Sequence, residues 1–542
     1  MKKLLIKLNI ILCFSVIFLS ANKTQGQIVN DHVYKFSKVL SLINTFYVDT
    51  VNQEKIVETA IIEMLKKLDP HSIYVNKEEV KKMNEPLEGN FEGVGIQFNI
   101  MDDTIMVVSP ISGGPSEKVG IRAGDRIVKI DGELVAGIGV KNSDVMKKLR
   151  GAKGTIVTMG IARRSISELL DFTVTRDKIP IYSIEASYMI DNEIGYIKLN
   201  RFSRTSMTEF KEALSKLKTQ NMKKLILDLQ DNGGGYLDVA FELADQFLDN
   251  NKIIVYTEGI NSPRKDYKST ANGEFENGKL VVLVDENSAS ASEIVSGAVQ
   301  DWDRGLIIGR RSFGKGLVQR PFDLPDGSMV RLTIAKYFTP TGRCIQKSYE
   351  KGAGDYSKDI INRFNSGELS NEDSIHFPDS LKYTTKIKSR AVYGGGGIMP
   401  DYFVALDTTP LTDYYSKMIR KGTINSFLLN YVDKNRKDFS AKYPVFDKFF
   451  KEYEVSDALL DELKEQAKKD KIEPKEGQVM GAEETARLKR QMKALIANDI
   501  WKPGEFWQII NTENEIIKKA VEVLKDNAAY EKKLNKNTAT KR

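Results

Sequence analysis

Cysteine and long apolar runs are both scarce in this 542-residue chain. The two cysteines are Cys13 and Cys344, and Cys13 lies in an N-terminal stretch that we expect to be cleaved off. The remaining chain cannot form an internal disulfide, so its stability must come from burial of a core rather than from covalent cross-links. After this stretch no run is long and apolar enough to cross a membrane, which takes about 20 residues.

The first 26 residues have the layout of a secretory signal peptide. Three lysines precede an apolar stretch at residues 8–19, and small residues follow near Gly26. A large residue, Leu12, precedes Cys13, which argues against a lipoprotein attachment site. We therefore expect residues 1–26 to be removed and the mature protein to be exported, periplasmic and soluble.

A strong excess of positive charge is also lacking. The net charge is +7 for the whole chain, and the leader holds four lysines and no acidic residue, so +3 remains for the mature chain. This surplus is too small to indicate a nucleic-acid-binding protein. With 41% hydrophobic and 29% charged residues the chain is typical of a globular protein, and its length predicts about three or four domains.

Residues 27–87 show helical periodicity, and residues 88–178 change to short strands and glycine turns. The second block resembles a PDZ domain, which implies that a loop of backbone N–H groups receives the carboxylate of a peptide C-terminus. In this sequence the position of that loop is taken by Gly93, Val94, Gly95 and Ile96, and the glycines let the backbone approach a ligand. The alternative is that these glycines only turn a small β domain.

Strands and helices alternate from about residue 180 to 350, which predicts an α/β core. A strand at 224–229 runs into Asp231-Asn232-Gly233-Gly234-Gly235, and a helix follows from Leu237. The glycines leave N–H groups bare near a helix terminus, an arrangement that suits an oxyanion. An ordinary loop explains the same pattern.

A serine cluster and a lysine follow in the same core. A buried strand at 281–284 leads into Ser288-Ala289-Ser290-Ala291-Ser292, and helical spacing begins after Glu293. Ser290 with Glu293 fits a capping box, which would make the serine purely structural. Ser288 and Ser292 are rival hydroxyls. The lysine, Lys315, is flanked by Gly314 and Gly316 after the next apolar run.

Scarcity of histidine points to Lys315 as the base. Histidine is the usual partner of a serine nucleophile, but the chain has only His32, His71 and His376, all outside residues 180–350. Burial in an apolar setting would lower the pKa of a lysine from its ordinary value of about 10.4. We therefore expect neutral Lys315 to accept the proton of Ser290.

Several segments together resemble the carboxy-terminal processing peptidases, or tail-specific proteases, of the S41 family. They are residues 288–293, 314–319 and 231–235 with the PDZ block, and the resemblance covers about residues 30–410. It implies an α/β multidomain fold with a crotonase-like serine protease core at 179–410, between a helical N-terminal segment with the PDZ domain and a helical C-terminal region. It also implies Ser290 as nucleophile, Lys315 as base and Gln319 as a lysine-orienting group, without metal or nucleotide cofactor.

Distances along ideal strands and helices weaken the case for two further candidate residues. Lys315 and Gln319 would lie about 13 Å apart on an ideal strand, so Gln319 is a weaker candidate than the serine and lysine. Asp301 lies about 16 Å along the helix from Ser290, which indicates a structural role. We expect the oxyanion donors to be the N–H of Ala291 and one from the glycine turn, here taken as Gly234.

Residues 348–390 read as a charged insertion or an extended hairpin over the surface. Residues 411–542 read as a helical region with an apolar stripe at Leu488, Met492, Leu495 and Ile496. The stripe indicates packing against the body of the protein, with a membrane surface as the alternative and a homodimer contact as the next possibility. The favoured function is an exported serine endopeptidase that captures free apolar C-termini of proteins or peptides through its PDZ domain. The alternative is a non-catalytic PDZ scaffold. An adaptor protein is a further candidate partner, and no nucleic acid is expected.

Overall fold

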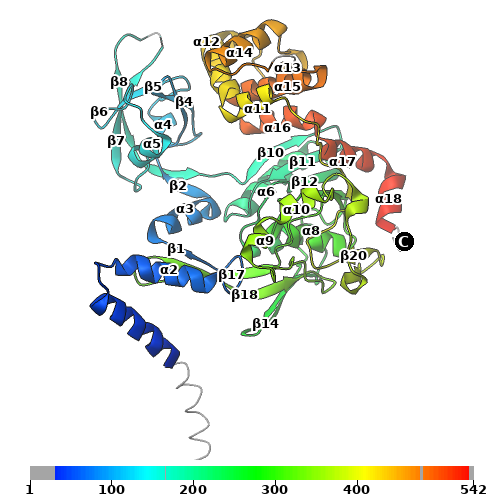
Figure 1. Ribbon diagram of the computed structural model, residues 1–542. Coiled ribbons are helices and arrows are strands. Elements are labelled where there is room, and N and C mark those ends of the chain that lie inside the picture. The colour runs from blue at the N-terminus through cyan, green and yellow to red at the C-terminus, as the bar shows by residue number, and fades with distance from the viewer. Residues whose placement is uncertain (1–30, 165, 476–479, 536–542) are drawn as a thin grey trace, which may run out of the picture. The chain divides into compact units, whose positions relative to one another are not determined.

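The computed structural model describes residues 31–164, 166–475 and 480–535 (Figure 1). The predicted leader, residues 1–26, lies outside the described residues. The chain divides into two compact units, Met1–Tyr74 and Val75–Arg542. In the described ranges, no helix is both long enough and apolar enough to cross a membrane.

The described part of the first unit is mostly helical, as its periodicity predicts. Residues 31–46 form a helix, α2 spans Gln53–Leu65, and β1 (Ile73–Val75) begins near the end of the unit. The Asn52 side chain caps α2 by accepting a hydrogen bond from the Lys55 N–H at 3.0 Å. This bond satisfies one of the backbone donors that a helix start leaves without a partner.

The block that resembles a PDZ domain is an antiparallel sheet with two short helices. Its strands are β3 (Ile96–Met101), β4 (Thr104–Pro110), β5 (Arg126–Ile130), β6 (Glu133–Leu134), β7 (Ile156–Ala162) and β8 (Leu170–Thr175), and its helices are α4 (Pro115–Lys118) and α5 (Asn142–Leu149). The strand order β3-β4-β5-β7-β8 leaves β3 at one edge of the sheet. Before this sheet come α3 (Lys77–Glu88) and β2 (Asn90–Gly93), and β2 pairs with β9 (Asp177–Pro180).

The core of the second unit is a sheet with the order β10-β11-β12-β15-β16-β21. Its strands are β10 (Ile184–Met189), β11 (Ile194–Leu199), β12 (Lys224–Asp228), β15 (Lys279–Val284), β16 (Leu306–Gly309) and β21 (Tyr402–Phe403). From β11 onward the strands run parallel, and β10 pairs antiparallel to β11. Strands buried on both faces need nearly continuous apolar sequence, which explains the run Leu280–Val284.

Two layers of helices cover this sheet. One face packs on α6 (Ser206–Thr219), α7 (Leu237–Asp245) and α8 (Ala291–Asp301) through residues such as Leu227, Val282 and Val295. The opposite face, with Ile226 and Val281, packs on the C-terminal helix α17 (Glu515–Lys525), shown in red beside the sheet in Figure 1. Residues that alternate along each strand therefore enter two separate hydrophobic cores.

A second sheet lies beside the first one in the same unit. The strand β13 (Ile253–Gly259) pairs with β14 (Ser262–Lys268) and with β18 (Met329–Phe338), and β18 pairs with β17 (Leu317–Asp323). The strand β17 begins two residues after Lys315, so Lys315 belongs to the loop that links β16 with β17. The register between β17 and β18 shifts between Val318 and Gln319.

The segment 348–390 contains short helices and one strand of a hairpin, and a few buried residues anchor it. It contains α9 (Ala353–Ser357), α10 (Asp359–Asn365), η1 (Glu372–Ser374), η2 (Asp379–Leu381) and β19 (Lys382–Thr384), which pairs with β20 (Ala391–Tyr393). Tyr356, Arg363 and Leu369 are buried in it, whereas His376 is exposed as expected. The charge of the segment hid the few residues that anchor it.

The C-terminal region is helical and forms a core of its own before it returns to the sheet. Its elements are α11 (Asp413–Arg420), α12 (Thr423–Lys442), α13 (Phe446–Glu452), α14 (Asp457–Lys469), α15 (Ala482–Ile500), α16 (Pro503–Ile510), η3 (Asn511–Glu513), α17 and α18 (Asn527–Asn535). The predicted stripe on α15 enters this core, where Leu488 and Met492 are fully buried and Leu495 packs at the margin. The stripe is therefore used within the chain.

Candidate active site

Ser290 lies between the end of a buried strand and the first turn of a buried helix. The strand β15 ends at Val284, and every residue of α8 is buried. Ser290 is the residue before α8, with φ 57° and ψ −110°. A residue other than glycine rarely adopts this backbone conformation because it is strained. The strain persists only where the surrounding structure enforces it. Strain of this kind is concentrated at functional sites.

The neighbouring serines have structural partners, as the sequence interpretation expected. The Ser288 hydroxyl donates to the Leu229 carbonyl oxygen at 2.8 Å, and the Ser292 hydroxyl donates to the Asn232 carbonyl oxygen at 2.8 Å. Both serines are completely buried, whereas Ser290 is partly exposed. Of the three hydroxyls, that of Ser290 is the one placed to meet a substrate.

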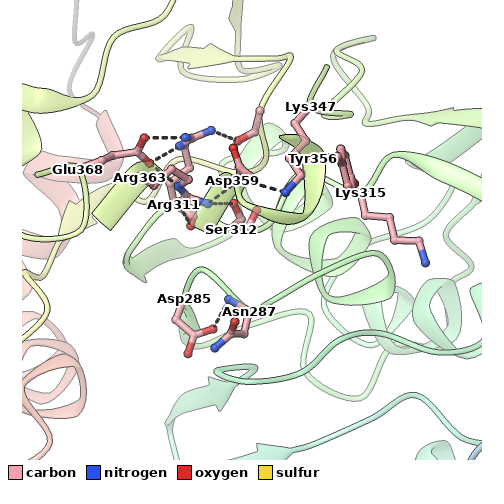
Figure 2. Close-up of polar contacts among 12 residues, drawn as sticks. Asp285, Asn287, Arg311, Ser312, Lys315, Lys347, Tyr356, Asp359, Arg363 and Glu368 are labelled. Carbon is pink, nitrogen blue, oxygen red and sulfur yellow. Dashed lines mark hydrogen bonds and ion pairs between the residues drawn. The ribbon is translucent and has the colours of Figure 1, made fainter. Parts of the chain in front are cut away.

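The turn before Ser290 is fixed by Asp285. Its carboxylate accepts hydrogen bonds from the N–H groups of Asp231, Asn287 and Ser288 at 3.0–3.2 Å. Figure 2 shows the contact between Asp285 and Asn287. Burial, reinforced by the nearby charge of Asp231, raises the pKa of Asp285 to about 6.

Glu293 links the serine turn to the lysine loop. Its buried carboxylate accepts from the N–H of Ser290 at 2.8 Å and from the N–H of Lys315 at 2.9 Å. It also accepts from the Ser312 hydroxyl at 2.6 Å and the Gly314 N–H at 2.7 Å. Burial raises the pKa of Glu293, and these four donors oppose that shift. The capping contact to Ser290 is thus one part of a larger connection that the sequence pattern did not indicate.

Tyr337 makes a second link between the same two residues. Its hydroxyl donates to the Lys315 carbonyl oxygen at 2.6 Å and lies 3.1 Å from the Ser290 carbonyl oxygen. Tyr337 is on β18 and is buried. The side chains of Glu293 and Tyr337 therefore both contact the backbones of Ser290 and Lys315, the serine and the lysine that the sequence singled out.

The glycine turn packs directly against Ser290. A Cβ atom on Gly234 would lie 2.9 Å from the Ser290 Cβ and 3.0 Å from the Ala291 nitrogen. Asn232, fully buried, holds this turn because its side chain donates to the Leu199 carbonyl oxygen at 2.8 Å and accepts from the Gly234 N–H at 2.9 Å. In this state the Gly234 N–H is engaged by Asn232, so it can serve an oxyanion only after that bond is exchanged.

The two remaining candidates of the core lie in different settings. Gln319 is partly buried on β17, and its side-chain nitrogen lies 3.5 Å from the Thr333 hydroxyl oxygen. Because Lys315 precedes β17, the distance expected for one continuous strand does not apply to the pair. Asp301 is completely buried at the far end of α8, where it pairs with Arg343 at 2.8 Å and accepts from Thr341. These contacts support a structural role for Asp301.

The proposed carboxylate loop of the PDZ domain joins β2 to β3. Val94 is buried, and its carbonyl oxygen accepts from both the N–H and the hydroxyl of Ser116. Gly95 has φ 76°, and a Cβ there would lie 2.8 Å from Ile179 Cδ1. This position therefore requires glycine. Ile96 begins the edge strand β3, and Gly93 ends β2.

The described residues contain no group of three or more His, Cys, Asp or Glu side chains placed to hold a metal ion. A polar cavity of about 650 Å³ lies elsewhere, between Gln230, Arg310 and the C-terminal helices. Neither Ser290 nor Lys315 lines it.

Four segments of the chain match family models. Residues 193–353 match peptidase family S41, and residues 106–163 match a PDZ domain. Residues 16–79 match the N-terminal domain of the activating protease CtpB, and residues 414–502 match a family of unknown function, DUF8443.

Known proteins with similar sequences are named as proteases. A carboxy-terminal-processing protease of Bartonella bacilliformis is 38% identical over 317 residues, which are 58% of this chain and 72% of the relative. A probable CtpA-like serine protease of Staphylococcus aureus is 36% identical over 326 residues, 60% of this chain and 64% of that protein. Among solved structures, the photosystem II D1 C-terminal processing protease is 30% identical, covering 56% of this chain and 82% of that one with a TM-score of 0.32.

The site, the family models and the similar sequences define a serine-type peptidase that carries a PDZ domain. More narrowly, the chain belongs to the carboxy-terminal-processing proteases of peptidase family S41.

Proposed function

We propose that this peptidase is an exported endopeptidase that uses Ser290 as nucleophile and Lys315 as general base. The observation that carries the proposal is the double connection between the two residues. Glu293 accepts the N–H of each, and Tyr337 contacts the carbonyl oxygen of each. Positioning of this quality matters because a displacement of about 1 Å can reduce a rate about 100-fold.

In the first step, the Ser290 oxygen attacks the scissile carbonyl carbon while its proton passes to neutral Lys315. The protonated lysine then donates this proton to the leaving amine, and water releases the acyl group from Ser290. The Ala291 N–H, at the start of α8, and an N–H of the glycine turn 233–235 stabilise the oxyanion. Gln319 supports the orientation of the lysine.

The PDZ domain supplies recognition of a free apolar C-terminus. What supports this role is the edge position of β3, which leaves a strand to which a peptide can add, together with the glycine-dependent turn at Gly95. Its substrates are protein or peptide chains with exposed apolar tails. An adaptor protein and a homodimer through the C-terminal helices remain predictions from the sequence.

Degradation of an unfolded protein with a free apolar tail tests the proposed function. Wild type should degrade this substrate, and Ser290→Ala should bind it without cleaving it. The same substrate with a charged tail should be degraded more slowly by wild type. A Ser290→Ala protein that degrades the substrate as fast as wild type would contradict the assignment of the nucleophile. The non-catalytic scaffold has no support from the family to which the chain belongs.

A further inference from the structure

The loop that carries Lys315 is held from two sides. On one side, Glu293 of α8 accepts hydrogen bonds from Ser312, Gly314 and Lys315. On the other side lie α9 and α10 of the segment 348–390, shown with their contacts in Figure 2. The mechanism above uses the first support and gives the second no role.

Arg363 of α10 makes the closest contacts of this second support. Its side chain is 3% exposed and donates to the Ser312 carbonyl oxygen at 3.1 Å and the Arg311 carbonyl oxygen at 2.6 Å. It also donates to Glu368 at 2.7 Å, and Glu368 in turn accepts two bonds from the Arg311 side chain. A guanidinium with fixed, forked donors is suited to bond two neighbouring carbonyl groups at once.

Lys347 and Gln346 extend this support to the glycines around Lys315. The Lys347 ammonium lies 3.7 Å from the centre of the Phe313 ring and pairs with Asp359 of α10 at 2.9 Å. The Lys347 N–H donates to the Gly314 carbonyl oxygen at 3.0 Å. The Gly316 N–H donates to the Gln346 side chain at 2.8 Å.

The direction of the Lys315 side chain separates it from this cluster. Figure 2 shows it leaving the loop on the side away from Arg363, Lys347 and Glu368. The contacts described above hold the backbone of the lysine loop. Since Gly314 and Gly316 give the loop little stiffness of its own, its shape depends on such outside contacts.

We propose that Arg363 is a positioning residue for Lys315, through which the segment 348–390 keeps the catalytic base in place. The proposal rests on the proposed function in that it takes Lys315 as the base. Arg363 acts on the carbonyl groups of Arg311 and Ser312, and these fix the path of the chain into Gly314 and Lys315. Without this hold the lysine moves more freely and is better hydrated, which favours its charged form.

The test compares Arg363→Gln and Arg363→Lys with wild type and with a control variant, Arg390→Gln. Arg390 is also buried, and its polar partners are Asp303, Asp401, Thr385 and Gln300, all outside the loop 311–316. We expect Arg363→Gln to lower kcat on a peptide substrate by about 10- to 100-fold with a smaller change in KM. The acid limb of its pH–kcat profile should move to higher pH. Arg363→Lys can bond one carbonyl group, so its kcat should lie between those of wild type and Arg363→Gln. Arg390→Gln should lose thermal stability, but the acid limb of its pH–kcat profile should stay at the wild-type pH.

Hydrogen exchange in the loop gives a readout that does not depend on activity. The amides of Gly314 and Lys315 should exchange faster in Arg363→Lys than in wild type or Arg390→Gln. Unchanged exchange of these amides together with an unchanged pH profile would overturn the proposal, even if Arg363→Gln proves too unstable to assay. Lys315→Ala is measured in parallel: if it keeps wild-type activity, the proposed base is wrong, while the exchange experiment still decides whether Arg363 holds the loop.

Discussion

Glu293 is the residue of the site for which a single substitution should lower both stability and activity. Its carboxylate faces four donors, from Ser290, Ser312, Gly314 and Lys315. In Glu293→Gln one oxygen becomes an NH₂ group, so two of these donors lose their acceptor. Each buried unsatisfied donor costs about 1–3 kcal/mol, so we expect a loss of about 2–6 kcal/mol in unfolding free energy together with a fall in kcat of about 100-fold.

Chemical denaturation and steady-state kinetics check this expectation. Glu286→Gln is the matched control, because Glu286 is a buried carboxylate of the same turn and pairs with Arg310. It should cost stability without a comparable loss in kcat. If Glu293→Gln and Glu286→Gln lower kcat equally, the link between Ser290 and Lys315 does not have the role given to it here.

Asp285 makes the stability of the core depend on pH. Its folded-state pKa of about 6 lies above the value of about 3.9 expected in the unfolded chain. The folded state therefore binds the proton more tightly, so the contribution of this group to stability is complete below about pH 4 and is lost as pH rises through 6. A difference of about two pKa units corresponds to about 3 kcal/mol.

Asp285→Asn removes this titration and keeps an oxygen for the N–H donors of the turn. The unfolding free energy of Asp285→Asn relative to wild type should increase by about 3 kcal/mol between pH 4 and pH 7. Urea unfolding across this range measures the change. A relative stability that stays constant with pH, or falls, would show that the Asp285 carboxyl is not protonated in the manner described.

At the scale of elements, the contact between the glycine turn and the serine turn sets the shape of the site. Gly234 has φ 101°, and a Cβ there meets the Ala289 carbonyl oxygen and the Ser290 Cβ at 2.9 Å. Gly234→Ala should therefore displace the nucleophile and reduce kcat by about 100-fold. Gly233 provides the control, since its Cβ would have no heavy atom within 4 Å. Equal activity of Gly234→Ala and Gly233→Ala would contradict this packing.

The regular elements of the core could be predicted from the sequence because their signals are local. The apolar run that forms β15, the small residues that begin α8 and the glycines that follow β12 each follow a pattern within a few residues. The same holds for Ser290, whose position between strand and helix is visible in the chain. Such local patterns fix which segment forms which element.

The contacts between distant segments could not be predicted in this way. Glu293 reads locally as a helix cap, and its bonds to Gly314 and Lys315 span 21 and 22 residues. Asn232 bonds Leu199, which is 33 residues away in the sequence. Arg363 lies in a segment whose charge suggests a surface loop, and it bonds Ser312, which is 51 residues away. Single-chain periodicity contains no information about such pairs, so the support of the site appeared only in the structure.

At the scale of the whole molecule, the C-terminal helices complete the core. Ile517, Ala520 and Leu524 of α17 pack on the same sheet face as Ile226 and Val281, and the face would be exposed without them. This burial explains why the apolar residues of a lysine-rich region are needed for a stable core. The region is therefore part of the fold of the protease core as well as a helical cluster of its own.

Tail capture by the PDZ domain predicts that different substrates respond differently to one substitution. Gly95→Leu combines strain at φ 76° with a contact to Ile179, and strain of this kind costs about 1–2 kcal/mol, or about tenfold in binding. We expect cleavage of a protein with an apolar tail to fall about tenfold, and cleavage of a small ester to stay near wild type. Gly154→Ala, with φ 88° and open space, is the control. Equal losses on protein and ester would contradict tail capture.

The central claim is that Ser290 and Lys315 act together, and the pH dependence of acylation in Lys315→Ala tests it most directly. A single-turnover assay with a peptide amide substrate measures the step in which Ser290 loses its proton. For wild type, the acylation rate plotted against pH should show an acid limb set by one titrating group. In Lys315→Ala the acylation rate should fall by at least about 1,000-fold, and this acid limb should disappear. Lys315→Ala that acylates at the wild-type rate with an unchanged limb would contradict the account.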